Sequence, residues 1–269
     1  MSLEAKVIDS RNNPTFKRFV RVANNKDRSL YILEGVHLCQ EFLQKGNLAE
    51  LKYIVFESNA LNKALADNSN HELQALYESY KSDAIVLGVN LFKQLCDVKT
   101  PQGVLIVAET KQNKLEDICL NETLVLIDRV QDPGNLGTII RTTAAAGIKQ
   151  IVLSTGTVNP WSSKVLRSAQ GAHFGLTVFN DCDLSALIKR LEIPVYASAL
   201  DHEAKSLYED KLPKHCAWLF GNEGQGVSEE LLRQATQHIF IPQSEAVESL
   251  NVAVACGVIL FEHRRQLLT

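Results

Sequence analysis

Two stretches near the C-terminus decide how this chain is interpreted: Leu219-Phe-Gly-Asn-Glu-Gly-Gln-Gly-Val-Ser228 and Ile241-Pro-Gln-Ser-Glu-Ala-Val-Glu-Ser-Leu-Asn-Val-Ala-Val-Ala255. Each begins at an apolar run that predicts a buried strand, passes through a loop of small and polar residues, and leads into a helix. Ser228 is expected to cap the first helix, and the second is expected to run from Ser249 to about Arg265. We expect the two strands to be neighbours, so that the loops at their carboxyl ends form a pocket for a small polar ligand.

A third segment has the same order of features. Asp132-Pro-Gly-Asn-Leu-Gly-Thr-Ile-Ile-Arg-Thr-Thr-Ala-Ala-Ala-Gly147 follows the apolar run 124–128 and also leads into a helix. Any one of these segments could be an ordinary strand-to-helix turn that needs positive φ. Taken singly, Asn135 and Asn251 could be residues at helix starts, and Arg141 could be a surface residue. Three such segments in this order and spacing are far more specific than one.

The three segments together resemble the motifs of a known family. Asn135-x-Gly-x-x-x-Arg141, Phe220-Gly-Asn-Glu-Gly-x-Gly226 and Ser249-Leu-Asn-Val-x-x-Ala255 resemble those of the SpoU (TrmH-type) RNA ribose methyltransferases of the SPOUT superfamily, over roughly residues 122–269. The resemblance implies an α/β fold, with a C-terminal trefoil-knot domain preceded by a small α/β, ribosomal-protein-like RNA-binding domain. It also implies a homodimer, S-adenosylmethionine as the cofactor, structured RNA as the partner, and methylation of a ribose 2′-hydroxyl.

The resemblance also assigns cofactor-binding residues. The cofactor would be contacted by the backbone of four residues and would lie close to two polar side chains: Phe220, Gly221, Ile241 and Leu250, then Asn222 and Ser249. Ser198, at the polar end of a predicted strand 193–198, could border the same pocket. Many relatives have Met and Gly where this chain has Gln243 and Glu245, and a second Ser where it has Ala253. We therefore expect Glu245 to place a carboxylate near the cofactor loop.

The catalytic residues implied by the resemblance are Arg141, Asn135, Glu223 and Asn251. A guanidinium keeps its proton up to about pH 12, so it is a poor general base. We therefore expect Arg141 to bind the adjacent phosphate and to stabilise the developing alkoxide. Asn135 and Asn251 would orient Arg141 and the ribose, and Glu223 would pair with a basic group or fix its loop. Because the cofactor carries the reactive methyl group, no metal is expected.

Alternating strand and helix patterns divide the chain. We expect an RNA substrate-binding domain at 1–110, a polar linker at 111–121 and the methyltransferase domain at 122–269. In the first domain, strands are expected at 30–33, 51–56, 84–87 and 103–108, with helices at 36–43, 72–77 and 91–95. Turn-rich loops at 34–37 and 100–103 could flank RNA or could be ordinary connections.

Basic residues gather at the N-terminus although the net charge is −3. Residues 1–28 carry seven basic and three acidic side chains, and Arg11, Lys17 and Arg18 are candidates for phosphate contacts. Phe16 could stack on a base. A solvated amphipathic helix with an apolar inner face explains the same residues equally well. On a predicted helix at 159–171, Lys164 and Arg167 could form a positive wall near the first motif, or a solvated face.

Composition sets further limits on the class of protein. Hydrophobic residues make up 45% and charged residues 22%, no apolar run approaches the ~20 residues of a membrane span, and no signal-peptide core begins the chain, so a cytoplasmic protein is expected. The six cysteines form no C-x-x-C pair and are expected to be reduced core residues. His202, His215 and His238 have no metal-ligand spacing, and no dinucleotide-binding fingerprint is present.

We therefore expect a ribose 2′-O-methyltransferase acting on RNA. Large-subunit (23S) ribosomal RNA is preferred over transfer RNA because of the separate N-terminal domain. The rival interpretation is a non-catalytic SpoU-type protein that binds RNA or assists ribosome assembly. Methylation of a base nitrogen is a third possibility, against which the Asn135-x-Gly-x-x-x-Arg141 motif argues.

Overall fold

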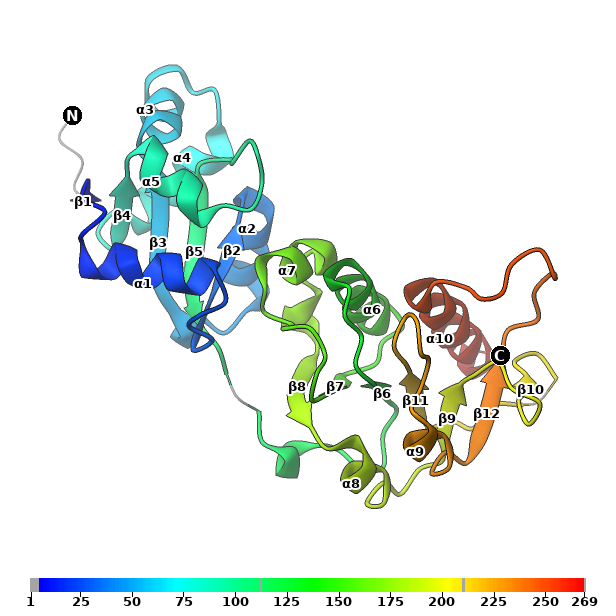
Figure 1. Cartoon of the computed structure of the whole chain (residues 1–269). Helices are drawn as coiled ribbons and strands as arrows, with labels where there is room; N and C mark the ends of the chain where they lie inside the picture. The colour runs from blue at the N-terminus through cyan, green and yellow to red at the C-terminus, as the bar shows by residue number, and fades with distance from the viewer. Residues whose placement is uncertain (1–4, 112, 210, 269) are drawn as a thin grey trace. The chain divides into compact units, whose positions relative to one another are not determined.

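The structure, a computed structural model, describes residues 5–111, 113–209 and 211–268. The chain forms two compact units: the first combines residues 1–111 with 161–174, and the second combines residues 112–160 with 175–269 (Figure 1). The predicted boundaries differ from this division in two respects: residues 113–121, predicted as a linker, group with the second unit, and Trp161–Phe174 groups with the first. Leu166 is buried in the core of the first unit, and the Trp161 ring lies 4.7 Å from that of Tyr31.

The first unit contains a five-stranded mixed sheet of order β1-β4-β3-β5-β2. Its elements in chain order are β1 (Lys6–Ile8), α1 (Pro14–Ala23), β2 (Leu30–Glu34), α2 (Val36–Lys45), η1 (Leu48–Glu50), β3 (Leu51–Glu57), α3 (Ser58–Asp67), α4 (His71–Tyr80), β4 (Ala84–Leu87), α5 (Val89–Phe92), η2 (Lys93–Leu95), β5 (Val104–Glu109) and α7 (Ser163–Ala169), followed by the turn η4 (Ala172–Gly175). The pairs β1–β4 and β3–β4 are parallel, and the pairs β3–β5 and β2–β5 are antiparallel.

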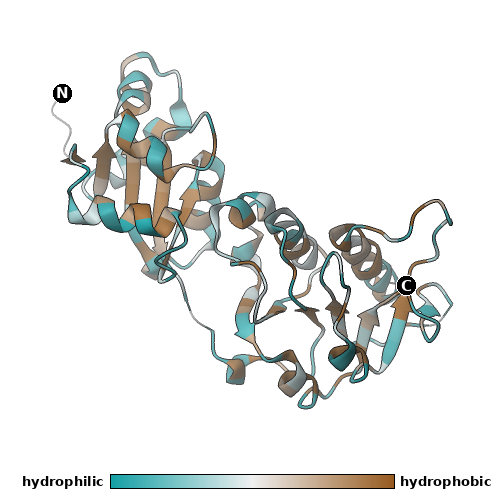
Figure 2. Ribbon diagram, in the orientation of Figure 1, coloured by the Kyte–Doolittle hydropathy of each residue, from teal (hydrophilic) through white to brown (hydrophobic). Residues whose placement is uncertain are grey.

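Both faces of this sheet are covered. Because successive side chains of a strand point to opposite faces, Ile54 and Phe56 join the core under α2, α3 and α4, whereas Val55 joins the core under α1 and α5. A sheet that is buried on both faces requires apolar strands without alternation, and the strands are brown in Figure 2. This is why the runs 30–33, 51–56, 84–87 and 103–108 could be identified as strands from the sequence.

The second unit contains a seven-stranded sheet of order β10-β12-β9-β11-β6-β7-β8, in which every pairing is parallel. Its elements are η3 (Leu115–Asp117), β6 (Leu124–Ile127), α6 (Pro133–Ala145), β7 (Gln150–Ser154), β8 (Thr177–Cys182), α8 (Leu184–Ile188), β9 (Val195–Ser198), β10 (Lys205–Ser206), β11 (Ala217–Phe220), α9 (Glu229–Leu232), β12 (Gln237–Phe240) and α10 (Val252–Leu268). The expectation that β11 and β12 are neighbours is wrong, because β9 lies between them.

Two helices on one face of this sheet carry the motif residues. Helices α6 and α10 pack side by side and run parallel, since Asn251 contacts Asn135 near their starts and Arg264 contacts Ala146 near their ends. Helices α8 and α9 cover the other face, where Leu187 and Leu231 join the apolar core. The three predicted motifs therefore belong to one unit.

Some elements differ from the sequence expectations. The short strands β1 and β10, the strand β8 and the helix α3 were not predicted, and α7 begins only at Ser163. The trefoil knot implied by the resemblance stays a prediction, because strand order alone does not define how a chain is threaded. All six cysteines are free thiols, and four of them are buried. None of the described helices is long and apolar enough to cross a membrane.

Candidate active site

A pocket of about 520 Å³ lies at the carboxyl ends of β9, β11 and β12. The seven residues predicted to bind the cofactor all line it: Ser198, Phe220, Gly221, Asn222, Ile241, Ser249 and Leu250. Ser198 takes part because β9 lies between β11 and β12 and brings its own carboxyl end to the pocket. The volume is in the range of small-molecule and cofactor sites.

The loop after β11 is a tight turn closed by its own backbone. Asn222 and Gly226 exchange two backbone hydrogen bonds of 2.9 Å each. A Cβ atom on Gly221 would lie 2.0 Å from the backbone carbon of Gly226, so position 221 excludes any side chain. The Asn222 side chain also fixes the loop, because its Oδ1 accepts from the Gly224 N–H at 2.9 Å and its Nδ2 donates to the Arg129 carbonyl at 2.8 Å.

A chain of hydrogen bonds joins the three motifs beside the pocket. Asn251 Nδ2 donates to Asn135 Oδ1 at 2.9 Å, and Asn135 Nδ2 donates to Glu223 Oε1 at 3.0 Å. Asn251 Oδ1 in turn accepts from the Ala253 N–H at 2.9 Å, which satisfies a free amide at the start of α10. Asn251 is therefore both a helix-capping residue and a link between two motifs.

Glu223 fixes its loop against the start of α6. In addition to the Asn135 side chain, its carboxylate accepts backbone N–H groups from Asp132 at 2.9 Å and Gln131 at 3.1 Å. Burial opposes ionisation and is the largest single influence, but the hydrogen bonds together outweigh it and hold the pKa of Glu223 below its ordinary value. Glu223 was expected either to pair with a basic group or to fix its loop, and these contacts fit the second role.

The structure does not bring Arg141 to these residues within one chain. Arg141 is exposed on α6, lies outside the set of residues that line the pocket, and has no side-chain hydrogen bond or ion pair among the described residues. Six positions after Asn135, it points about 120° away from that residue on a helix of about 3.6 residues per turn. The expectation that Asn135 orients Arg141 therefore does not hold within a single subunit.

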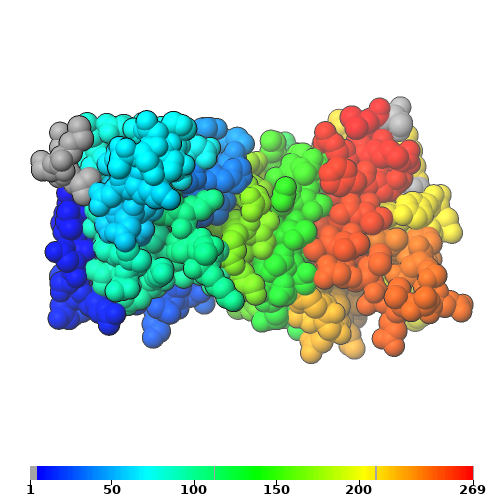
Figure 3. Space-filling view, turned by 90° about the horizontal axis from the view of Figure 1, so that it is seen from above, coloured from blue at the N-terminus to red at the C-terminus, as the bar shows by residue number. Residues whose placement is uncertain are grey.

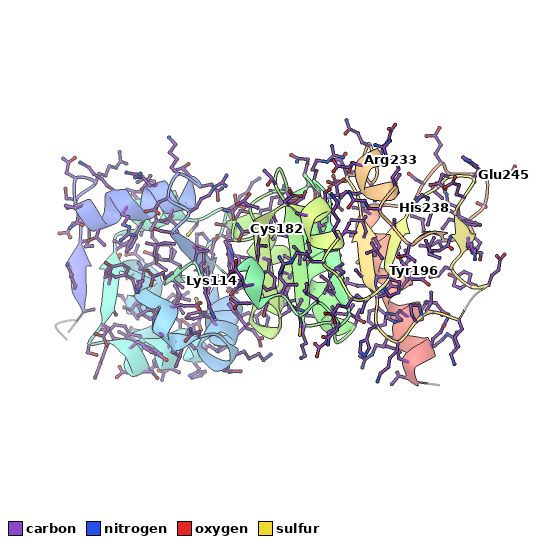
Figure 4. The ribbon with its side chains drawn as sticks, turned by 90° about the horizontal axis from the view of Figure 1, so that it is seen from below. Lys114, Cys182, Tyr196, Arg233, His238 and Glu245 are labelled. Atoms are coloured by element: carbon purple, nitrogen blue, oxygen red, sulfur yellow. The ribbon has the colours of Figure 1, made fainter. Side chains whose placement is uncertain are left out.

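The loop between β12 and α10 carries the residues that depart from the family pattern. Gln243 lines the pocket and braces the loop, since its Nε2 donates to the Glu248 carbonyl at 3.2 Å. Glu245 is exposed and outside the pocket lining, and Figure 4 shows it on the loop, away from the strands that carry Tyr196 and His238. The carboxylate of Glu245 is therefore on this loop but does not line the pocket. Figure 3 shows this loop, in orange, beside the red helix α10 on one face of the second unit.

Sequence reasoning missed an ion pair that supports the pocket. Asp128 is almost fully buried at the end of β6, and the Arg129 guanidinium donates to both of its carboxylate oxygens, at 2.9 and 3.2 Å. Asp128 Oδ2 also accepts the Ser228 N–H at 2.9 Å, and Ser228 makes no side-chain capping bond, contrary to expectation. The sequence did contain a signal for this ion pair, because the carboxylate of Asp128 directly follows the apolar run of a buried strand.

A second missed pair lies at the rim of the pocket. His238, expected to be a plain surface or core residue, has Nδ1 2.8 Å from Asp201 Oδ2 and Nε2 3.0 Å from the Leu232 carbonyl oxygen. Asp201 lines the pocket. No spacing in the sequence could reveal this pair, because it depends on β9 and β12 being adjacent.

Helix α1 of the first unit carries the N-terminal candidates for RNA contacts. Arg11 and Lys17 are exposed, whereas Arg18 donates to Asp27 Oδ2 at 3.2 Å. Phe16 is only 2% exposed and packs in the core with Phe19, so the expectation that it could stack on a base is wrong. The charged face and the apolar face predicted for this helix are both present.

The other two RNA-binding candidates lie in α7, within the first unit. Lys164 is exposed, and Arg167 Nη2 is 2.9 Å from Asp97 Oδ2. The proposed positive wall beside the first motif is not formed within the second unit, because the apolar face of α7 buries Leu166 in the core of the first unit.

Comparison with known proteins agrees with this geometry. The family model described as SpoU rRNA Methylase family matches residues 122–261, which contain all three motifs. The chain belongs to the SpoU rRNA methylase family.

Two curated relatives and one solved structure are similar over nearly the whole chain. The 23S rRNA (guanosine(2553)-2′-O)-methyltransferase RlmP of Bacillus subtilis is 31% identical over 96% of this chain and 99% of its own length. An uncharacterized tRNA/rRNA methyltransferase of Synechocystis is 33% identical over 96% of this chain and 93% of its own. An AdoMet-bound rRNA methyltransferase from Sinorhizobium meliloti has a TM-score of 0.81 and 30% identity, over 99% of this chain and 100% of that one.

Proposed function

We propose that this protein is an S-adenosylmethionine-dependent methyltransferase that modifies a ribose 2′-hydroxyl in large-subunit ribosomal RNA. The observation that carries the proposal is the hydrogen-bonded chain Asn251–Asn135–Glu223, which joins the three motifs beside the pocket. Similarity to RlmP over nearly the full length of both chains supports the reaction and the class of RNA.

The residues of the pocket fit the proposed cofactor. Phe220, Ile241 and Leu250 give it apolar walls, and the close approach of the Gly221 and Gly226 backbones fixes the loop that borders it. The AdoMet-bound relative from Sinorhizobium meliloti supports the same ligand. When bound, S-adenosylmethionine supplies a methyl group activated by its sulfonium. The chain itself must then bind and orient the ribose and stabilise charge on the 2′-oxygen.

Arg141 is the proposed catalytic residue. Its guanidinium would bind the phosphate next to the target ribose and stabilise the negative charge that develops on the 2′-oxygen. Because Arg141 is exposed on α6 and outside the pocket of its own chain, we propose that it serves the site of a second subunit in a homodimer. Asn135, Glu223 and Asn251 would hold the surrounding loops in a fixed geometry for the ribose.

An apolar strip on α10 supports the homodimer. Val254 and Phe261 are 52% and 48% exposed, and they lie seven positions apart, two turns along the same side of the helix. Sedimentation at micromolar concentration tests this part of the proposal. A species near 60 kDa is expected from a 29.9 kDa chain, and a monomer of 29.9 kDa would remove the shared site.

The first unit is the proposed RNA-binding unit. Arg11, Lys17 and Lys164 are exposed and have no acidic side-chain partner among the described residues, so they are available for phosphates. Arg18 and Arg167 are each engaged by a carboxylate, and their contribution to RNA binding would be smaller.

The test is transfer of labelled methyl from S-adenosylmethionine to ribosomal RNA purified from cells that lack the protein. Wild type should label one nucleotide, whose 3′ linkage then resists alkaline cleavage, and Arg141→Ala should lower the rate about 100-fold or more. Arg190→Ala is the matched control, because Arg190 is also exposed in the second unit and has no described side-chain partner.

Each outcome of this test has a definite meaning. Label on transfer RNA alone would change the substrate, and label on a base would exclude ribose methylation. Tight RNA binding without label on any RNA would favour a non-catalytic RNA-binding protein.

A further inference from the structure

A second pocket of about 300 Å³ lies at the opposite edge of the second unit's sheet. Its lining comes from the residues just before β6, the turn between α6 and β7, the loop before β11, and the last turns of α10. The first pocket lies at the carboxyl ends of strands, whereas this one lies at the amino ends. Within the part of the chain that the structure describes, the two pockets share no lining residue. We call this second site the basic pocket.

The basic pocket is rich in positive charge on a chain whose net charge is −3. Lys149, Lys214 and Arg264 line it, together with His215, and Glu122 is the one acidic residue among the described residues of the lining. The three cationic side chains are exposed and have no ion pair with a carboxylate among the described residues. Three cationic side chains and one carboxylate leave net positive charge in the lining, and this charge would attract an anion.

Arg264 is held in place by the end of α6. Its Nη1 donates to the Ala146 carbonyl at 2.9 Å, where the free carbonyls of a helix C-terminus favour a cation. Gly147 has a φ of +86°, and a Cβ atom there would lie 2.8 Å from the same nitrogen. The guanidinium therefore occupies space that a side chain at position 147 would take.

The loop that carries Lys214 is also held in place. His263 Nε2 donates to the Pro213 carbonyl at 2.9 Å, and Trp218 Nε1 donates to His263 Nδ1 at 3.0 Å. These partners require the neutral imidazole with its proton on Nε2. The loop is thereby tied to α10 directly beside Arg264, so two of the three cations are carried by restrained backbone.

We propose that the basic pocket binds a phosphate group of the RNA backbone, through Lys149, Lys214 and Arg264. This inference rests on the proposed function, because it takes RNA as the substrate. Phosphate is the oxyanion that lysine and arginine bind in nucleic acids, by charge and by multiple N–H donors. The contact would add affinity without selecting a base, and it would leave the cofactor pocket unchanged.

The test compares wild type with Lys149→Gln/Lys214→Gln, which removes two charges from exposed positions and leaves Arg264 and its bond to Ala146 in place. The affinity for ribosomal RNA should fall about fivefold or more at moderate salt, and the slope of log K against log salt should become shallower by roughly 1–2. The affinity for S-adenosylmethionine, measured by calorimetry, should not change. Lys189→Gln/Arg190→Gln is the matched control, because it removes the same charge from exposed residues outside the pocket.

The outcomes separate this inference from the proposed function. If wild type methylates RNA but Lys149→Gln/Lys214→Gln binds RNA with the same affinity and salt slope as the control double variant, the inference is overturned and the proposed function stands. If wild type neither binds nor methylates RNA, the proposed function fails first. If inorganic phosphate raises the melting temperature of wild type but not of Lys149→Gln/Lys214→Gln, while RNA affinity is equal in both, the pocket takes free phosphate and the RNA assignment is wrong.

Discussion

The polar groups at the two edges of the second unit's sheet differ in whether they are paired. At the carboxyl edge, the side chains of Asn135, Glu223 and Asn251 satisfy one another and backbone N–H groups at the starts of α6 and α10. At the amino edge, Lys149 and Lys214 extend to solvent without a carboxylate partner in the described structure. A network whose groups are paired fixes geometry in advance, whereas unpaired cations provide attraction for an anion. The first condition suits precise orientation of reactants, and the second suits affinity for RNA.

Among the variants that test this contrast, the largest effect is expected from breaking the paired network. Glu223→Gln should lower methyl transfer at least about tenfold and the free energy of unfolding by about 1–2 kcal/mol, because an amide NH₂ would replace an oxygen that accepts N–H groups. Initial rates with labelled cofactor and urea unfolding measure the two quantities. Glu230→Gln is the control, since Glu230 is exposed on α9 and has no side-chain hydrogen bond in the described structure. Equal losses in the two variants would show that the network does not hold the site.

A pH titration tests the contacts of His263, which hold one loop of the basic pocket. Burial lowers the pKa of His263, so the folded chain keeps this imidazole neutral while the unfolded chain binds a proton below about pH 6.5. Its contribution to stability is therefore present above pH 6.5 and is lost as the pH falls toward the lower folded pKa.

The measurement is the free energy of unfolding between pH 7.5 and 5.5 for wild type and His263→Gln, which keeps a donor and an acceptor but does not titrate. Wild type should lose stability more steeply, by at most about 1.4 kcal/mol per pH unit for one proton. His202→Gln, at a highly exposed histidine, should follow wild type. Parallel curves for wild type and His263→Gln would contradict a buried neutral His263.

The smallest effect is expected at Gly147. Gly147→Ala should lower the free energy of unfolding by about 1 kcal/mol, because φ is +86° and the new Cβ atom would push against Arg264. Thermal unfolding measures the change. Gly175→Ala should have a smaller effect, because no atom lies within 4 Å of its Cβ position and its φ is not in the left-handed region. If both variants unfold at the same temperature, neither the left-handed backbone at position 147 nor the contact with Arg264 costs stability when a Cβ atom is added.

Much of this protein follows from sequence. Apolar runs such as 84–87 and 124–127 are strands because each is buried on both faces, and that requirement is visible in the residues themselves. The segments around Asn135, Asn222 and Asn251 could be recognised because tight turns and helix starts need particular residues at particular spacings. These features depend on neighbours within a few positions along the chain.

Other features depend on contacts between distant segments, and only the tertiary structure decided them. The position of β9 between β11 and β12 brings Asp201 to the pocket and pairs it with His238. The packing of α7 in the first unit places Arg167 beside Asp97, to which it donates a hydrogen bond. The basic pocket combines four segments that no local pattern connects. Strand order and helix packing are set by which apolar faces bury one another across the whole chain, and local periodicity carries no information about that choice.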